Sequence, residues 1–218
     1  MIILGLTGSI GMGKTRAAEN FRRLGVPVHD ADKAVHDLLS GDADVIAEIG
    51  ALIPGAVKKG ALDRAAIAGV VFSDPEALEK IEQIVHPKVR LREKRFLERT
   101  ARDGRRLVVL DVPLLFETGG DKRCDGVITV SAPAFIQRQR VLRRRDMTPE
   151  KLAAILARQM ADAEKCKRSD FVVKTGLGRG YSLHQILNIV SITRNWQGRH
   201  WPPRVAPLIA TGPVRSGG

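Results

Sequence analysis

The chain has 218 residues, of which 44% are hydrophobic and 4% aromatic, and its formal net charge at pH 7 is +12. This size and composition predict one main α/β domain with room for small insertions, and the apolar run at the amino terminus is too short to cross a bilayer. Cys124 and Cys166 lie far apart and outside any Cys/His cluster, so we expect a cytoplasmic protein with neither a disulfide framework nor a zinc site, and with no membrane partner.

Residues 2–15 carry the most informative pattern. Apolar residues 2–7 predict a strand, and a helix with Ala17, Ala18 and Phe21 on one face follows the loop. Between them stands the Walker A pattern, in which backbone N–H groups wrap nucleotide phosphates and a lysine reaches the terminal ones. We expect Thr15 to ligate Mg²⁺ through its hydroxyl. The expected ATP-binding residues of this loop are Gly8, Gly11, Met12, Gly13, Lys14, Thr15 and Arg16.

Residues 25–30 predict a short second strand, and a helix with Val35 and Leu38 on its apolar face follows. Parallel strands send their carboxyl ends to one edge of a sheet, so Asp32 should lie on the same side as the phosphate loop. There Asp32 is the candidate base that orients or deprotonates an attacking hydroxyl. The alternative is that Asp32 only caps the helix.

Residues 42–100 show no strong strand and predict an inserted helical subdomain, with helices over 62–72 and 75–97. Pro87 should bend the second helix, because proline lacks the N–H and disfavours helical geometry in the residue before it. His86, beside this bend, is either a buried structural histidine or a substrate contact.

Residues 107–112 are apolar without alternation, as in a parallel strand covered on both faces. Residues 126–130 and 171–173 predict two further strands, for five in total. Asp111 ends the first of these three. It stands where a Walker B carboxylate would hold a Mg²⁺-bound water, or else its side chain is satisfied by backbone amides.

Five arginines fall within the eight residues 138–145, ahead of a helix that begins with Thr148-Pro149-Glu150 in capping style. Arg140 and Arg144 are four residues apart, so both can converge on one phosphate as part of a lid. A solvated helical face is the alternative. A last helix should begin near Tyr181, and residues 196–218, rich in Pro, Gly and Arg, predict a loosely ordered basic tail.

Seven short motifs in this order resemble those of the dephospho-CoA kinase family, over residues 1–176. They are Gly-Leu-Thr-Gly-Ser-Ile-Gly-Met-Gly-Lys-Thr at 5–15, Val-Pro-Val-His-Asp-Ala-Asp at 26–32, Leu-Asp-Arg at 62–64, Val-Phe at 71–72, His-Pro-Lys-Val at 86–89, Pro-Leu-Leu-Phe-Glu at 113–117 and Gln-Arg-Val at 139–141.

The resemblance implies ATP-dependent phosphorylation of the ribose 3′-hydroxyl of dephospho-CoA to give CoA and ADP, the last step of coenzyme A synthesis. It matches Asp32 to the family's proposed base, Lys14 and Thr15 to its phosphate and Mg²⁺ contacts, and Arg140 to its lid arginine. Arg64 and His86 fall in its acceptor-binding domain.

The implied fold is a P-loop NTPase-type three-layer α/β sandwich with a five-stranded parallel sheet, a helical substrate-binding insertion and a helical lid. We expect the nucleotide-binding core at 1–41, 101–137 and 168–195, the acceptor domain at 42–100, the lid at 138–167 and the basic tail at 196–218. A monomer is expected. The chain departs from the family pattern at Lys174-Thr175-Gly176, where an Asn usually precedes the glycine near the adenine, and at Ile155, where the family often has Arg.

The basic charge predicts an anionic partner, because charge of one sign steers ligands of the opposite sign. Polyphosphate substrates and nucleic acid both fit, although the low aromatic content offers little for base stacking, so nucleic acid is the less favoured partner. Three alternatives stay open: a P-loop kinase for another small hydroxyl or nucleotide acceptor, a basic ATPase that binds nucleic acid, and a module that holds nucleotide without chemistry. In the last, Asp32 and the lid arginines would lack a purpose.

Overall fold

A five-stranded parallel sheet organises the computed structural model, which describes residues 1–58, 60–63, 66–67, 69–70 and 74–202. The strand order is β2-β5-β1-β6-β7, which confirms the predicted five-stranded parallel sheet. The strands are β1 (Ile2–Thr7), β2 (Val28–Asp30), β5 (Leu107–Asp111), β6 (Gly126–Ser131) and β7 (Phe171–Lys174).

Both faces of the sheet are apolar and covered. On one face, Leu4 and Leu6 pack with Phe21 of α1 (Lys14–Arg23) and Ile186 of α9 (Arg179–Thr193). On the other face, Ile3, Val108 and Leu110 pack with Leu97 of the long helix α5 (Pro75–Arg102) and with the loop that follows β5. Burial on both sides explains why the strands lack polar alternation, and it confirms the three-layer prediction.

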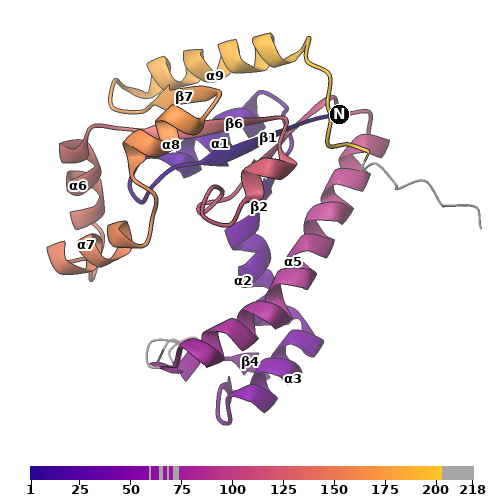
Figure 1. Cartoon of the computed structure of the whole chain (residues 1–218), viewed down its shortest axis with the longest axis vertical. Helices are drawn as coiled ribbons and strands as arrows, with labels where there is room; N and C mark the ends of the chain where they lie inside the picture. Colours follow the sequence, from indigo (N-terminus) through magenta and orange to yellow (C-terminus); the bar gives the residue numbers. More distant parts are fainter. Residues whose placement is uncertain (59, 64–65, 68, 71–73, 203–218) are drawn as a thin grey trace, which may run out of the picture.

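The insertion has a hydrophobic core of its own. The side chains of Leu38 in α2 (Ala31–Gly41), Val45 and Ile49 in α3 (Ala43–Leu52), and Ile81 and Val85 in α5 pack together away from the sheet. Figure 1 shows this body hanging below the sheet on α2 and α5. The insertion is therefore a second body with a core separate from that of the sheet.

The described residues of the interval 42–100, for which we predict helices and no strong strand, include a short pair of strands. A small antiparallel hairpin joins β3 (Val57–Lys58) to β4 (Ala61–Leu62). Two residues per strand are too few to produce a period-two pattern, so the sequence gives no signal. Leu62, the predicted start of a helix over 62–72, is the last residue of β4, and much of the rest of that interval lies outside the described residues.

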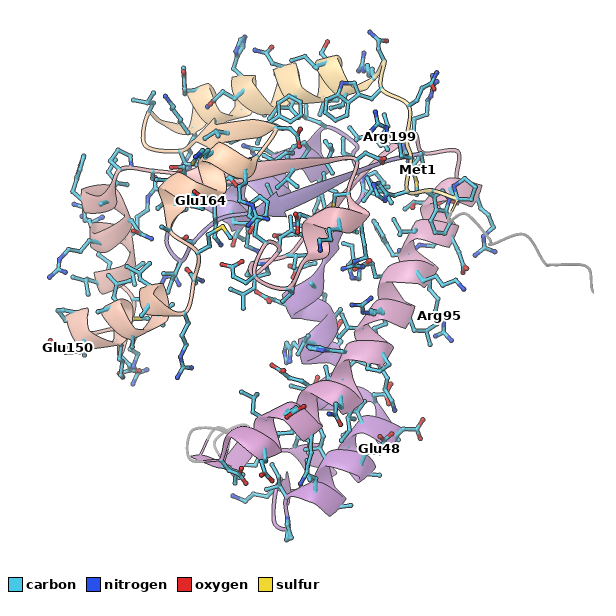
Figure 2. The ribbon with its side chains drawn as sticks, viewed as in Figure 1. Met1, Glu48, Arg95, Glu150, Glu164 and Arg199 are labelled. Atoms are coloured by element: carbon cyan, nitrogen blue, oxygen red, sulfur yellow. The ribbon has the colours of Figure 1, made fainter. Side chains whose placement is uncertain are left out.

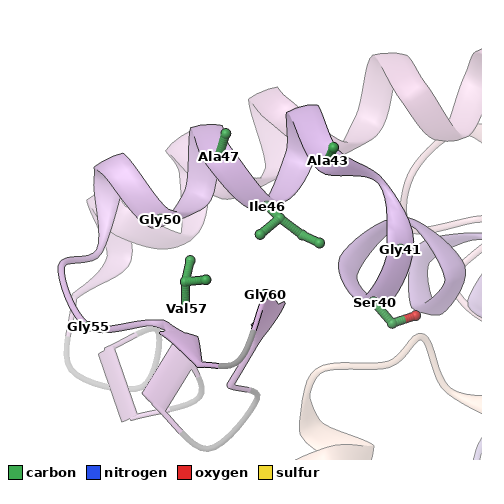
Figure 3. Close-up of a pocket in the computed structure, with 9 residues that line it drawn as sticks. All are labelled: Ser40, Gly41, Ala43, Ile46, Ala47, Gly50, Gly55, Val57 and Gly60. Atoms are coloured by element: carbon green, nitrogen blue, oxygen red, sulfur yellow. The ribbon is translucent and has the colours of Figure 1, made fainter.

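The hairpin packs closely on α3. A β-carbon at Gly50 would stand 2.6 Å from a methyl carbon of Val57, so glycine permits the approach. Beside this contact lies a hollow of about 510 Å³ with small and apolar lining, drawn in Figure 3. The described residues that line it include no charged side chain, so it offers no groups that bind phosphate.

Helix α5 continues through Pro87 without a break. Figure 1 shows it changing direction between the part beside α3 and the part that rises beside the sheet, in accord with the expected bend. Among the described residues, no helix combines the length and the hydropathy that crossing a membrane requires.

The segment between β6 and β7 forms three helices, α6 (Ala134–Leu142), α7 (Pro149–Ala157) and α8 (Asp162–Arg168), and the loop before β6 contains a short 3₁₀ turn, η1 (Gly120–Arg123). Thr148 caps α7 by accepting the Lys151 N–H, which confirms the predicted start. Figure 1 shows α6 and α7 projecting from the carboxyl end of the sheet.

Residues 196–202 correct the prediction of a loosely ordered tail. The Trp196 ring stacks on Phe171 at 5.6 Å between centroids, and a β-carbon at Gly126 would stand only 2.7 Å from the indole. The Arg199 N–H donates to Asp125, and Trp201 packs on the sheet face that α5 covers. Packing the two indole rings on the core stabilises this segment, although the Pro and Gly residues around them predict a loose tail. Residues 203–218 lie outside the described part of the chain.

The Trp196 contact predicts a stability role for this segment. Trp196→Ala should lower the free energy of unfolding by about 3 kcal/mol, because it removes a large ring from the edge of the core. Urea unfolding followed by circular dichroism measures the change. Ile192→Ala, which truncates a side chain that is 53% exposed on α9, is the control and should change stability by less than about 0.5 kcal/mol. Equal effects of the two would contradict the tertiary role of Trp196.

Candidate active site

A cavity of about 770 Å³ lies at the carboxyl end of β1, between the phosphate loop and the helices α6 and α7. It collects residues from the first turns of α1 and α2, from the lid, and from the segment after β7. Of the residues expected at the site, the following line it: Gly8, Gly11, Gly13, Lys14, Thr15, Arg16, Asp32, Arg140 and Arg144.

The floor of the cavity is the phosphate loop and the start of α1. Gly13 is the residue before the helix and has a left-handed conformation, with φ at 99°. No side chain caps α1 there, so its first N–H groups stay free for an anion. Met12, expected at the ATP site, is buried and has its sulfur near the Ala132 N–H, so only its backbone belongs to the loop.

Lys14 pairs with Asp111 across the strand ends. The Lys14 Nζ lies 2.5 Å from the Asp111 Oδ1, and only 4% of the Asp111 side chain is exposed. The pair therefore decides against backbone amides as the partner of Asp111. Burial raises the pKa of Asp111, the Lys14 ammonium opposes that rise, and the charges of Asp30 and Asp32 add to it.

Asp32 is not the cap of its helix. The Asp30 carboxylate accepts the Lys33 N–H at 2.9 Å and caps α2, which leaves Asp32 exposed in the first turn at the phosphate cavity. Partial burial raises the pKa of Asp32, Lys14 lowers it, and Asp30 raises it further. A carboxylate with a raised pKa, next to bound phosphate, is suited to accept a proton.

Arg140 joins the lid to the phosphate loop. Its Nη1 donates to Thr175 Oγ1 at 2.9 Å and lies 3.4 Å from the Gly11 and Met12 carbonyl oxygens, while Nη2 donates to the Thr175 carbonyl at 2.8 Å. Arg144 is exposed and lines the same cavity. In this structure Arg140 is held by Thr175 and by backbone carbonyls, whereas the guanidinium of Arg144 makes no ion pair or hydrogen bond with the described residues and is free to meet a phosphate.

Thr175 stands at the position where the chain departs from the family pattern. Its hydroxyl donates to the Met12 carbonyl at 2.5 Å, and its side chain packs against the Cα side of Gly13. Gly176 and Gly178 follow on the cavity wall. The segment after β7 therefore supports the phosphate loop directly, a contact between residues 163 positions apart that no local pattern announces.

Gln137 of α6 and Gln159, which follows α7, hold the Ile10 backbone. The Ile10 N–H donates to Gln159 Oε1 at 3.1 Å, and Gln137 Nε2 donates to the Ile10 carbonyl at 2.8 Å. Sequence reasoning missed both, because lone glutamines in a helical region carry no motif. Together they tie α6 and the segment after α7 to one residue of the phosphate loop.

Glu117 fixes the base of the lid. It lies 2.9 Å from the Nζ of Lys165, whose side chain is fully buried, and it accepts the Met160 N–H at 2.8 Å. Burial alone would raise the pKa of Glu117, but the Lys165 hydrogen bond, the Met160 N–H and the Lys165 charge outweigh it and lower the pKa. Glu117 ends the Pro-Leu-Leu-Phe-Glu motif, which gives that motif a structural role.

Of the two residues expected in the acceptor domain, the structure describes His86. His86 is exposed on α5 and does not line the phosphate cavity, which removes the buried structural histidine as an explanation. Arg64 lies outside the described residues. Ile155 does line the cavity, with an apolar side chain where the family pattern often has arginine.

Magnesium fits the donor set of this cavity. The Thr15 hydroxyl and the Asp32 carboxylate line the cavity, and the Asp111 carboxylate is paired with the lining residue Lys14, so the hard oxygen ligands that Mg²⁺ prefers are present. Within the described residues, no group of three or more His, Cys, Asp or Glu side chains forms a metal cage. That is the expected arrangement for an ion bound largely through substrate phosphates and water.

The cavity has amide donors on its floor and guanidinium groups on its roof, the arrangement with which P-loop kinases enclose a nucleotide triphosphate. The chain is thus a P-loop kinase in fold and in site. The family model for dephospho-CoA kinase matches residues 2–177. The chain belongs to the dephospho-CoA kinase family.

Relatives agree over most of the chain. The dephospho-CoA kinase of Mesorhizobium japonicum is 50% identical over 198 residues, which cover 91% of this chain and all of the relative. That of Paramagnetospirillum magneticum is 57% identical over 165 residues, 76% of this chain and 78% of the relative. The residues that the family model matches, 2–177, include the phosphate loop and residues 42–167.

Solved structures show the same architecture. The crystal structure of TT1252 from Thermus thermophilus is similar with a TM-score of 0.77 and 37% identity, over 90% of this chain and 98% of that one. Dephospho-CoA kinase from Campylobacter jejuni is similar with a TM-score of 0.66 and 25% identity, over 87% of this chain and 95% of that one. Shikimate kinase from Acinetobacter baumannii has a TM-score of 0.50 and 15% identity, over 90% of this chain and 96% of that one, and shares the fold alone.

The Glu117–Lys165 pair predicts a pH-dependent stability. Glu117→Gln should lower the free energy of unfolding at pH 7 by about 3 kcal/mol, because it leaves a buried ammonium without its counter-charge. The lowered pKa means that the carboxylate stabilises the fold above pH 4.5, its ordinary value, and loses this effect as the pH falls through the folded-state pKa. The deficit of the variant should therefore shrink below pH 4.5.

Urea unfolding between pH 3 and pH 8 measures this deficit. The control is Glu164→Gln, because Glu164 is exposed on α8, the helix that carries Lys165 (Figure 2). Its free energy of unfolding should stay within about 0.5 kcal/mol of wild type throughout. A deficit for Glu117→Gln that does not vary with pH would contradict the ionic role.

Proposed function

We propose that this chain transfers the γ-phosphoryl group of ATP to the ribose 3′-hydroxyl of dephospho-CoA, giving CoA and ADP, the last step of coenzyme A synthesis. The observation that carries the proposal is the meeting of Lys14 and Asp32 in one cavity, with Lys14 paired to buried Asp111, beside an insertion with its own core. Curated relatives about 50% identical bear the name dephospho-CoA kinase, which supports this acceptor.

The donor half of the site is positional and electrostatic. The free N–H groups of the phosphate loop and of the α1 amino terminus bind the phosphates, and Lys14 moves from Asp111 to the terminal phosphate when nucleotide enters. Arg140 and Arg144 stabilise charge that builds on the transferred group. Thr15 would hold Mg²⁺ through its hydroxyl, with Asp111 contributing through a water. The ion would neutralise charge on the phosphate oxygens.

The acceptor half depends on Asp32. The ribose 3′-oxygen attacks the γ-phosphorus while Asp32 accepts the hydroxyl proton, and the bond from that phosphorus to the bridging oxygen of ADP breaks. The product gains the phosphoryl group, and ADP leaves with the electron pair of the broken bond. The raised pKa of Asp32 suits a base that must take a proton from a hydroxyl.

We assign acceptor binding to the insertion, residues 42–100, and closure to the lid, residues 138–167. His86, exposed on α5, and Arg64 are the residues we propose for contacts with the acceptor. The insertion supports an acceptor as large as dephospho-CoA rather than a small hydroxyl compound. We further propose that the enzyme acts as a cytoplasmic monomer that requires Mg²⁺.

The catalytic assignment predicts a selective loss. Asp32→Asn should lower kcat on dephospho-CoA by about 10² to 10⁴-fold, because the amide cannot take the proton, while ATP affinity changes less than about threefold. The assay supplies ATP and Mg²⁺, offers dephospho-CoA, adenosine, AMP and shikimate in parallel, and identifies products by mass. Asp103→Asn, exposed at the end of α5 and remote from the cavity, is the matched control and should keep wild-type turnover.

Three outcomes separate the parts of the proposal. Wild-type turnover by Asp32→Asn would remove this residue from the mechanism and leave the acceptor assignment in place. Phosphorylation of another acceptor and not of dephospho-CoA would overturn the function itself. ATP hydrolysis that rises with added nucleic acid, and with none of the acceptors, would favour the ATPase alternative.

A further inference from the structure

A second cavity, of about 930 Å³, lies along the free edge of the sheet at β2. Its walls come from α1, β2, α2 and the upper half of α5. It shares no lining residue with the phosphate cavity, although Asp32 and Lys33 are neighbours in the first turn of α2 and line one cavity each. This edge cavity therefore lies outside the site of phosphoryl transfer.

Arginines dominate its wall. Four of them, Arg92, Arg95, Arg99 and Arg102, recur on α5 at spacings of three, four and three residues, which place them on one face of the helix. Arg22 of α1 joins them from the other side. Figure 2 shows Arg95 extending from α5 on the side away from the lid. The stripe on α5 runs for about 15 Å, because a helix rises about 1.5 Å per residue.

The acidic residues of this cavity already have partners. Asp30 caps α2, Asp37 pairs with Lys33 at 3.2 Å, and Glu98 lies 3.9 Å from Lys94. Within the described part of the chain, the guanidinium groups of Arg22 and of the four α5 arginines make no ion pair and no side-chain hydrogen bond. The wall therefore carries positive charge that the protein itself does not neutralise.

Two ordinary explanations account for part of this pattern only. Cations in the last turn of a helix interact favourably with its dipole, which suits Arg99 and Arg102. Arg92 and Arg95 lie two or more turns earlier, where this effect has faded. Like charges at these spacings repel one another along a helix, so the stripe needs a compensating anion.

The inner wall of the cavity supplies an independent sign of a missing partner. His29 is 91% buried, lines the cavity and has its ring 5.3 Å from that of Phe96. Its Nε2 is buried and has no hydrogen-bond partner within the described part of the chain. Buried polar atoms are normally satisfied, so an unpaired imidazole nitrogen beside five unpaired arginines indicates a polar ligand.

We propose that the edge cavity binds a small molecule that carries two or more linked phosphate groups. Its volume is that of a small-molecule site, and the arginine stripe offers several guanidinium groups in a row for oxyanions. Among the lining residues, Phe96 and His29 are the aromatic side chains and they contact each other, so the cavity offers little for base stacking, which disfavours a nucleic acid strand. The site is independent of the proposed phosphotransfer.

Calorimetric titration with inorganic tripolyphosphate at low salt, with EDTA present, tests the proposal. The full-length protein carries Lys14→Ala in every sample, so that the phosphate loop contributes little to the signal. Arg95→Ala together with Arg99→Ala should weaken binding at least tenfold. Arg95→Gln with Arg99→Gln, which keeps long side chains on the helix, should do the same. Equal affinity in all proteins would overturn the site.

The matched control is Lys80→Ala together with Arg90→Ala. It removes two charges from the same helix, outside the edge cavity, and should change the affinity less than twofold. A tenfold loss in this control would mean that tripolyphosphate follows net charge and not the cavity, which overturns the proposal. Orthophosphate that binds as tightly as tripolyphosphate would overturn the requirement for linked phosphates. A 20-nucleotide single strand that binds more tightly, with the same dependence on Arg95 and Arg99, would overturn the choice of a small ligand.

Discussion

The register of the central strands controls the active site. Because β1 pairs with β5 so that Leu6 lies opposite Asp111, and β2 pairs with β5 so that Asp30 lies opposite Asp111, three chain segments end at one point of the sheet edge. Lys14 closes that point as the counter-ion of Asp111. A one-residue slip in either pairing would turn these carboxylates to the opposite face of the sheet. The geometry of the site is therefore a consequence of strand pairing. The hydrophobic faces of β1 and β5 stabilise this pairing and, through it, the positions of the site residues.

The segment between β6 and β7 is held to the phosphate loop and to the loop after β5 by polar contacts. Gln137 and Gln159 bind the Ile10 backbone, Arg140 and Thr175 bind carbonyls of the glycine loop, and Glu117 of the loop after β5 holds buried Lys165 and the Met160 N–H. These contacts link the loop after β5, the loop after β7 and the lid into one polar network around the phosphate loop. Such networks specify a geometry sharply because each unpaired member would be costly. Arg140 consequently acts from a fixed base, and Arg144 keeps the freedom to move.

Local patterns predict the strands, the phosphate loop and the helix that Thr148 caps, because each depends on neighbours within a few residues. The same patterns could not decide whether Asp32 was cap or base, since both roles place a carboxylate at a helix start; the cap turned out to be Asp30. Sequence reasoning did not find the contacts of Thr175, Gln159 and Glu117, because their partners lie tens of positions away. The composition of residues 196–218 predicts a loose tail, because their Pro, Gly and Arg content outweighs the one large ring of Trp196 that packs on Phe171.

The distribution of charge says more than its sum. Many surface cations are neutralised by near neighbours, as Lys88 is by Asp42 and Glu48, and they contribute little to any external field. Among the described residues, guanidinium groups without an ion pair include those on the roof of the phosphate cavity and those at the edge of the sheet at β2. Both substrates of the proposed reaction carry phosphate, so a field of this sign draws donor and acceptor alike. A basic surplus of this kind is therefore sufficient for a kinase with two phosphorylated substrates, and the charge alone is no argument for a nucleic acid partner.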